Sequence, residues 1–284
     1  MNFSEWQQIC DAAQLGVVEH FDRINSTDNH ASWQLITTKG CYFTKTTLQR
    51  YAPMLLSEAK NLTAINNTHS LHSPQVVAQG QTKKTAWLVL QWITLKAQGS
   101  QQQLGRHLAA LHQHSHSQFG WQETNFIDHS IQYNHWLDNW VAFYRAQRLM
   151  PQLRRAKENG LAQELVSNVE KIITCLDDFF VDHNPLPSLL HGNLSVNHIA
   201  FTQDNTPIVF NPASYYGDRE MDIAMSELSK GFEPDFYTAY QGAYPLDKQY
   251  EQRKPIYQLY YLLNKFNLLG GDYAQQIRQL LNNL

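Results

Sequence analysis

The chain has 284 residues, of which 43% are hydrophobic, enough to bury the core of one two-lobed domain or of two small ones. Its net charge of −3 gives no reason to expect nucleic acid or an anionic membrane as a partner. The three cysteines, Cys10, Cys41 and Cys175, are widely spaced, which indicates free thiols in a reducing compartment and no zinc site. The chain starts without a basic and apolar leader and has no apolar stretch of membrane-spanning length, so we expect a soluble cytoplasmic protein.

The first third of the chain is predicted to form a sheet with one helix against it. Ser4 can cap a first helix that runs to about Ala13. Short alternating or β-branched runs, typical of antiparallel strands, lie at 17–24, 31–37, 41–46 and 85–91. We therefore expect an N-terminal sheet of about five strands that ends near residue 93.

Beyond Thr94 the hydrophobic period changes to 3.6 residues, which places a domain boundary there and divides the chain into 1–93 and 94–284. Helices are predicted at 104–112, 136–159 and 161–182, and a short hairpin is predicted near 199–210. His112, His114 and His116 alternate at the end of the first of these helices. This spacing suits helix capping and solvation better than a metal site.

The most informative residues lie in two later segments, LHGNLSVNH at 190–198 and FNPASYYGDRE at 210–220. With the PSLLHG run from Pro187 and the segment 255–271, they closely resemble the fructosamine kinase (ketosamine 3-kinase) family, in the aminoglycoside-kinase-like branch of the protein-kinase fold. The resemblance implies an α+β, bilobal fold with a small antiparallel-sheet N-lobe and a larger, mainly helical C-lobe. It also implies ATP-dependent transfer of phosphate to a ketosamine.

The family usually reads HGDLWSGN and DPAxYYGDRE in these segments, and this chain departs from both. Asn193 stands at the catalytic Asp position and Asn211 at the metal-ligating Asp position. His198 stands at the second metal position, and Ser195 replaces a sugar-facing Trp. An amide is a poor base, Mg²⁺ prefers anionic oxygen, and imidazole suits transition metals better. The resemblance thus implies ATP, while these residues argue against Mg²⁺.

Other family positions are kept. The resemblance assigns Lys45 to the nucleotide phosphates and Glu58 to orienting that lysine, and a surface lysine with an unrelated acid is the alternative. It assigns the main chain of Gln91 and Ile93 to the adenine. His191 is expected to pack within the loop more than to catalyse. Asp222 is expected to hold the loop backbone.

Two further departures concern the loop over the phosphates and the segment before the long helix. The connection at 25–30 has no glycine, and its Asp28 would oppose an anion. Asp128 stands where glycine is common in the family.

These residues support three hypotheses. The first is a pseudokinase that retains a nucleotide or ligand cleft but has little or no ketosamine 3-phosphotransferase activity. The alternative is an active ATP-dependent kinase for a sugar-amine or a glycated protein, in which another acid, Asp218 or Glu220, replaces the missing base. The third is a protein that binds a glycated or amino ligand without chemistry. A nucleotide and a sugar-amine are the expected small-molecule partners, and no protein partner is predicted.

Overall fold

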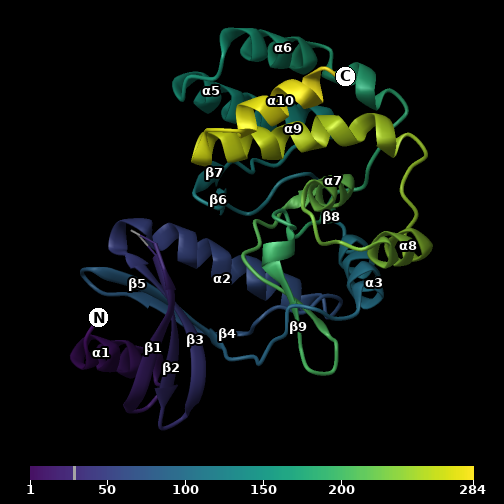
Figure 1. Ribbon diagram of the computed structural model, residues 1–284. Coiled ribbons are helices and arrows are strands. Elements are labelled where there is room, and N and C mark those ends of the chain that lie inside the picture. Colours follow the sequence, from purple (N-terminus) through teal and green to yellow (C-terminus); the bar gives the residue numbers. More distant parts are fainter. Residues whose placement is uncertain (28–29) are drawn as a thin grey trace. The chain divides into compact units, whose positions relative to one another are not determined.

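The computed structural model describes residues 1–27 and 30–284 and forms two compact units (Figure 1). The N-terminal unit comprises Met1–Ser100 and Ala200–Asn211, and the C-terminal unit comprises Gln101–Ile199 and Pro212–Leu284. The sequence-based division into 1–93 and 94–284 has one boundary. In the structure the later segment Ala200–Asn211 also belongs to the N-terminal unit.

A five-stranded antiparallel sheet forms the body of the N-terminal unit, as expected. Its strands are β1 (Val18–Ser26), β2 (His30–Thr37), β3 (Gly40–Leu48), β4 (Val76–Gln81) and β5 (Thr85–Gln91). Their order across the sheet is β1-β2-β3-β5-β4, and each pair of neighbours is antiparallel. Strand β5 has partners on both sides, and its residues 86–90 are all buried. The continuous apolar run at 86–90 therefore marks a strand that is covered on both faces.

Two helices cover the two faces of this sheet. Helix α1 (Phe3–Ala13) packs Trp6 and Cys10 into a cluster with Trp87 of β5, while helix α2 (Ala52–Asn67) packs its apolar residues against Leu88. Because successive side chains of a strand point to opposite faces, Trp87 and Leu88 place the two helices on opposite sides.

The cap of α1 differs from the sequence prediction. Asn2, and not Ser4, is the N-cap: its Oδ1 accepts from the Glu5 amide at 3.0 Å, and Glu5 Oε2 accepts from the Asn2 amide at 2.8 Å. This reciprocal pair satisfies two amides that the first turn leaves without helical partners, which a cap at Ser4 would not do.

The segment that joins the N-terminal unit from late in the chain is the predicted hairpin. Strands β9 (Ile199–Phe201) and β10 (Pro207–Val209) pair with each other. The Lys96 and Phe201 main chains exchange hydrogen bonds of 2.8 and 2.9 Å, and the Val209 amide donates to the His72 carbonyl at 2.9 Å. These bonds bring Asn211, at the end of the hairpin, into the N-terminal unit.

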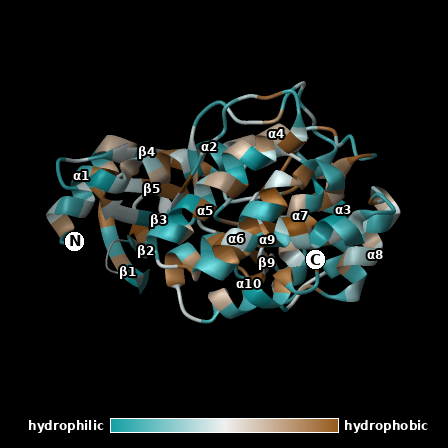
Figure 2. Ribbon diagram, turned by 90° about the horizontal axis from the view of Figure 1, so that it is seen from above, coloured by the Kyte–Doolittle hydropathy of each residue, from teal (hydrophilic) through white to brown (hydrophobic). Residues whose placement is uncertain are grey.

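The C-terminal unit is mainly helical. Its α-helices are α3 (Gln101–His112), α4 (Trp140–Tyr144), α5 (Met150–Glu158), α6 (Gln163–Thr174), α7 (Glu220–Leu228), α8 (Pro234–Ala243), α9 (Tyr250–Leu269) and α10 (Tyr273–Leu281). Two small sheets complete it: β6 (Asn125–Ile127) pairs with β7 (Ser130–Gln132), and β8 (Ser188–Leu189) pairs with β11 (Tyr216–Gly217). The helices alternate between hydrophilic and hydrophobic patches along their length (Figure 2), as helices with one buried face do.

The helix predicted at 136–159 is interrupted. Helix α4 starts only at Trp140, where Asn139 accepts from the Ala142 amide at 2.8 Å, and a π-helical stretch (Arg145–Leu149) separates it from α5. Pro151 has no amide hydrogen for the carbonyl of Gln147, and Arg148 Nη1 donates to that carbonyl at 2.9 Å instead. The helix predicted at 161–182 likewise ends at Thr174 and is followed by a 3₁₀ turn (Leu176–Phe180). Among the described residues, no helix has the length and apolarity needed to cross a membrane.

Candidate active site

The loop that carries His191 and Asn193 is held by a buried carboxylate. Asp222 of α7 accepts from the amides of His191 and Gly192 at 2.7 and 2.9 Å. Gly192 has φ +77°, and a Cβ there would lie 2.1 Å from the Ala213 carbonyl oxygen, so only glycine fits. Through these two hydrogen bonds Asp222 holds the backbone of the loop. His191 is fully buried, and its Nδ1 accepts from the Asn193 amide at 3.2 Å, which fits a packing role.

His112 also belongs to this support and is not solvated, contrary to the sequence-based interpretation. It is fully buried, with Nε2 donating to Asp222 at 3.1 Å and Nδ1 within 2.8 Å of the Tyr240 hydroxyl. Burial lowers its pKa despite the neighbouring Asp222 carboxylate. His112 is therefore a neutral part of the core, because a tertiary contact with α7 determines its environment.

The side chain of Asn193 lies beside a carboxylate that sequence reasoning had marked only as a departure from glycine. Asn193 is 1% exposed, and its Nδ2 donates to Asp128 Oδ1 at 3.1 Å. Lys265 Nζ of α9 lies 2.9 Å from Asp128 Oδ2. Burial raises the pKa of Asp128, but Lys265 and the hydrogen bond from Asn193 outweigh it and hold the pKa below its ordinary value. Asp128 is thus an anion near neutral pH. Lys265 carried no signal in the sequence.

His198, at the C-terminal end of the same loop, contacts the main chain of Asn193. Its Nδ1 donates to the Asn193 carbonyl at 2.8 Å, and the Ser195 hydroxyl lies 3.3 Å from the same nitrogen. A neutral ring that donates from Nδ1 carries its lone pair on Nε2, which is the tautomer that metal-binding imidazoles use. The chemistry of this donor fits a transition metal better than Mg²⁺.

In the N-terminal unit, Lys45 lies between two oxygen acceptors. Its Nζ donates to Glu58 Oε1 at 2.6 Å, and the two side chains are 20% and 15% exposed, so the expected ion pair forms. It also donates to Asn211 Oδ1. Phe43, two residues before Lys45 on β3, packs into the α2 cluster, so Lys45 projects from the face that α2 covers. Asn211 has φ +50°, a left-handed conformation that asparagine tolerates well.

The remaining residues predicted to lie at the nucleotide are Gln91, Ile93 and the loop at 25–30. The Gln91 amide donates to the Gln75 carbonyl at 2.9 Å, and Ile93 follows the end of β5. Of the loop at 25–30, Asn25 and Ser26 belong to β1 and His30 opens β2, whereas Asp28 lies outside the described residues.

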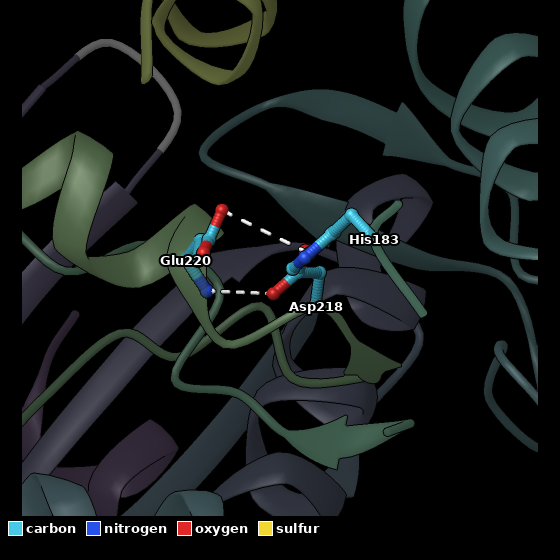
Figure 3. A group of neighbouring side chains, drawn as sticks. All are labelled: His183, Asp218 and Glu220. Atoms are coloured by element: carbon cyan, nitrogen blue, oxygen red, sulfur yellow. Dashed lines mark hydrogen bonds and ion pairs between the residues drawn. The ribbon is translucent and has the colours of Figure 1, made fainter. Parts of the chain in front are cut away.

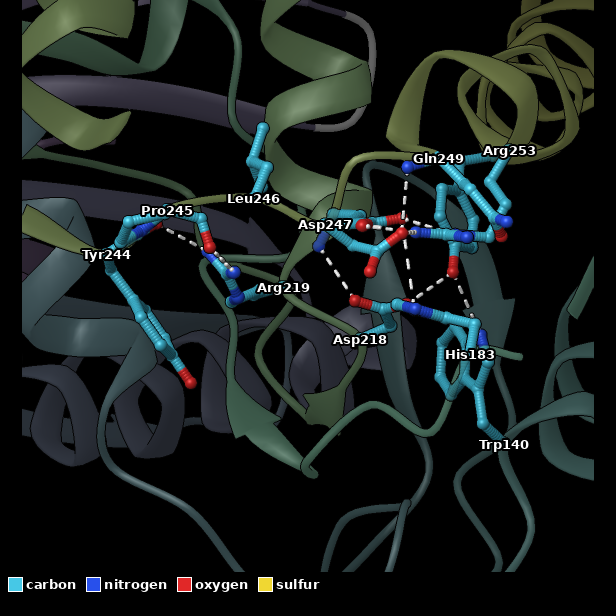
Figure 4. A network of polar contacts seen from close by, with 12 residues as sticks. Trp140, His183, Asp218, Arg219, Tyr244, Pro245, Leu246, Asp247, Gln249 and Arg253 are labelled. Carbon is cyan, nitrogen blue, oxygen red and sulfur yellow. Dashed lines mark hydrogen bonds and ion pairs between the residues drawn. The ribbon is translucent and has the colours of Figure 1, made fainter. Parts of the chain in front are cut away.

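Asp218 and Glu220, the acids nearest the missing base in the sequence, are engaged in a separate buried network (Figures 3 and 4). Asp218 Oδ2 lies 2.5 Å from His183 Nε2 and accepts from the Tyr257 hydroxyl. Both oxygens of Glu220 accept from Arg253 at 2.9 Å. A carboxylate held by such contacts must break them before it can act elsewhere.

The same network contains a group with metal-binding side chains that sequence reasoning missed. The ligand atoms of His183, Asp218 and Glu220 lie within 4.8 Å of one another. Figure 3 draws these three side chains. Each of them is engaged with a protein donor or acceptor, and the Arg253 guanidinium lies against Glu220. A cation would therefore compete with a permanent positive charge, and the group fits a hydrogen-bonded core better than a metal centre.

This network predicts a pH dependence of stability. Burial and the Asp218 charge raise the pKa of Glu220 from 4.5 to about 7, although Arg253 acts to lower it. Burial acts to lower the pKa of His183, but Asp218 and Glu220 outweigh it and raise that pKa above 6.5. Both groups then bind protons more tightly in the folded chain, so their stabilisation is complete at low pH and declines as pH rises through these values. Asp218 has a lowered pKa, and its opposite effect falls in the acid range.

We therefore expect the thermal midpoint to fall between about pH 5.5 and about pH 8, on the strength of these two groups. In His183→Gln the thermal midpoint should fall less steeply with pH, because glutamine can still donate to Asp218 but does not titrate. Thermal melts of the wild type and the variant across this pH range measure the two slopes. An identical slope in the variant would remove His183 from the explanation.

The fold places the chain among proteins with a protein-kinase-like fold. A thermostable mutant of an aminoglycoside phosphotransferase, solved with AMP-PNP and hygromycin B, aligns over 98% of each chain with a TM-score of 0.68 at 14% identity. A Haemophilus somnus protein described as a putative fructosamine-3-kinase aligns over 98% of this chain and 97% of its own, with a TM-score of 0.89 and 30% identity.

The sequence comparisons define the class further. The fructosamine kinase family model matches residues 4–284. A protein of Vibrio parahaemolyticus described as a probable ketoamine kinase is 35% identical over 266 residues, covering 92% of this chain and 91% of the relative. A relative of the same description in Synechocystis is 38% identical and covers 84% of this chain and 81% of its own length. The chain belongs to the fructosamine kinase family, and ATP use is what membership implies.

Proposed function

We propose that this chain is a pseudokinase of the fructosamine kinase family. It binds a nucleotide or related ligand and transfers little or no phosphate to a ketosamine. The observation that carries this proposal is the amide chemistry at the two positions that the family resemblance assigns to acids, Asn193 and Asn211. The amide oxygen of Asn211 accepts from Lys45, so the neutral side chain acts as a hydrogen-bond partner of the lysine.

Phosphoryl transfer needs a proton acceptor and charge neutralisation on the phosphates. Asn193 offers an amide in place of the acceptor, and neither Asn211 nor His198 offers the anionic oxygen that Mg²⁺ prefers. Loss of a general base alone typically lowers a rate by ~10²–10⁴-fold. The metal-side losses fall on a linked step, so the two effects need not multiply.

Nucleotide affinity should be nearly independent of Mg²⁺ and should depend on Lys45. We expect calorimetric titration with ATP or ADP to give dissociation constants that differ less than about 3-fold with and without Mg²⁺. Lys45→Met should weaken binding by at least ~10-fold, because it removes the cation that Glu58 orients. The same samples, incubated with labelled ATP and a fructosyl-lysine, should show no transfer above background.

Two outcomes would count against the proposal. Tight binding that requires Mg²⁺ would show that Asn211 serves as a metal ligand after all. Transfer by the wild type that is lost in Lys45→Met would establish an enzyme. Tightening by Mn²⁺ or Zn²⁺ would instead implicate His198, whose ring nitrogen suits those ions.

An active kinase with altered residues is the second candidate. The observation that favours it is the Asp128 carboxylate, hydrogen-bonded to Asn193 at 3.1 Å. A loop without its own acid therefore still has a carboxylate within reach.

A further inference from the structure

The turn between β6 and β7 places Asp128 in a left-handed backbone conformation. Asp128 follows β6 and precedes β7, and it adopts φ +52°, a left-handed conformation that most residues with a Cβ avoid. Aspartate in a turn commonly bonds its own nearby main chain. Here the hydrogen bonds recorded for its two oxygens run to Asn193 and Lys265, which lie 65 and 137 positions away.

These contacts hold the carboxylate in one orientation while leaving it reachable. The Asp128 side chain is 22% exposed and Lys265 is 32% exposed, whereas Asn193 beneath them is buried. A carboxylate has about four acceptor positions, and the two recorded bonds occupy one on each oxygen. The remaining lone pairs can accept from a ligand.

The neighbouring charges restrict what kind of ligand group this is. Lys265 keeps Asp128 ionised at neutral pH and offsets its charge. A bare cation would gain from Asp128 and lose to Lys265, whereas a neutral hydroxyl gains a charge-assisted hydrogen bond without that repulsion. The local charge therefore favours a hydroxyl donor.

We propose that Asp128, held between Asn193 and Lys265, is the acceptor for the 3-hydroxyl of a ketosamine ligand, in place of the acid absent at position 193. The proposal rests on the proposed function, because it names the ligand that the C-terminal unit binds. It concerns binding, so it stands whether or not phosphate transfer follows. Asn193 acts as a positioning residue whose amide orients the carboxylate.

Asp128→Asn is the sharpest variant, because asparagine tolerates the left-handed turn and keeps the shape while losing the charge. The probes are a fructosyl-lysine and its 3-deoxy analogue, titrated by calorimetry at neutral pH. We expect Asp128→Asn to bind the fructosyl-lysine ~10- to 100-fold more weakly, as loss of a charge-assisted hydrogen bond implies. The 3-deoxy analogue should bind the wild type and the variant alike.

The control is Lys157→Met, which breaks a surface ion pair with Glu170 of the same unit and should leave affinity unchanged. Thermal melts show whether Asp128→Asn is folded. Equal affinity of wild type and Asp128→Asn for the fructosyl-lysine overturns the proposal, as does failure of the wild type to bind it at millimolar concentration. Phosphate transfer by the wild type would overturn the pseudokinase proposal alone, so the two failures are distinguishable.

Discussion

Ketosamine phosphorylation is expected to appear only when several positions are reverted together. Asn193→Asp alone should not restore it, because the new carboxylate would lie beside that of Asp128, whose Oδ1 is 3.1 Å from the Asn193 amide nitrogen. Two adjacent carboxylates repel, and one of them takes up a proton. Asn211 and His198 would also remain unable to neutralise the phosphates.

The combination expected to work is Asn193→Asp, Asn211→Asp and His198→Asn, joined by Asp128→Gly. Glycine removes the opposing carboxylate and adopts φ +52° without strain. Relative to the wild type, we expect a gain in turnover of at least ~10²-fold, set by the restored base. The measurement is transfer from labelled ATP to a fructosyl-lysine by the wild type, the single reversion, the triple without Asp128→Gly and the quadruple.

Lys45→Met in the quadruple background is the control, since it should abolish the gained activity. Full activity of Asn193→Asp alone would contradict the argument, because it would mean that neither Asp128 nor the metal positions limit the reaction. A triple as active as the quadruple would show that Asp128 does not hinder a restored acid.

Arg253→Met is expected to destabilise the chain by ~3–5 kcal/mol, the usual cost of leaving a buried charge without its partner. Arg253 is fully buried, donates to both oxygens of Glu220 at 2.9 Å and to Asp247 at 2.8 Å, and lies in the network of Figure 4. The check is urea denaturation at about pH 8.5, above the pKa of about 7 that burial and Asp218 give Glu220. The double variant Arg253→Met with Glu220→Gln should recover much of the loss, because it removes the stranded carboxylate.

The matched control for Arg253→Met is Arg278→Met, which breaks an exposed pair with Glu164 in the same unit. We expect it to change the free energy of unfolding by less than ~1 kcal/mol, as surface pairs do. Similar effects of the two substitutions would mean that burial of the Arg253–Glu220 pair does not govern its contribution.

Local sequence patterns were sufficient for much of the fold. The alternating runs and turn residues predict β1, β2, β3 and β5, because side-chain burial in a strand repeats every two residues. The motifs around Gly192 and Asp222 predict the catalytic-type loop and its buried support, because those positions need a specific backbone conformation and a specific acceptor. The ion pair of Lys45 with Glu58 followed from the same resemblance.

Interruptions of regular structure were harder to predict. The π-helical stretch at Arg145–Leu149 lies just before Pro151, which has no amide hydrogen to donate to the Gln147 carbonyl, and the Arg148 side chain donates to that carbonyl instead. Hydrophobic periodicity reports the face that a helix buries, and it does not report such a local exchange of hydrogen bonds.

The sequence by itself determined the fold class, the family and the loss of acids at 193 and 211, because each of these depends on residue type at known spacings. Only the tertiary structure decided which side chains lie beside these positions. It brought Asp128 and Lys265 to Asn193, engaged Asp218 and Glu220 with His183 and Arg253, and moved Ala200–Asn211 into the N-terminal unit. Such pairings join residues tens to more than a hundred positions apart. They follow from the packing of whole elements, which no local pattern encodes.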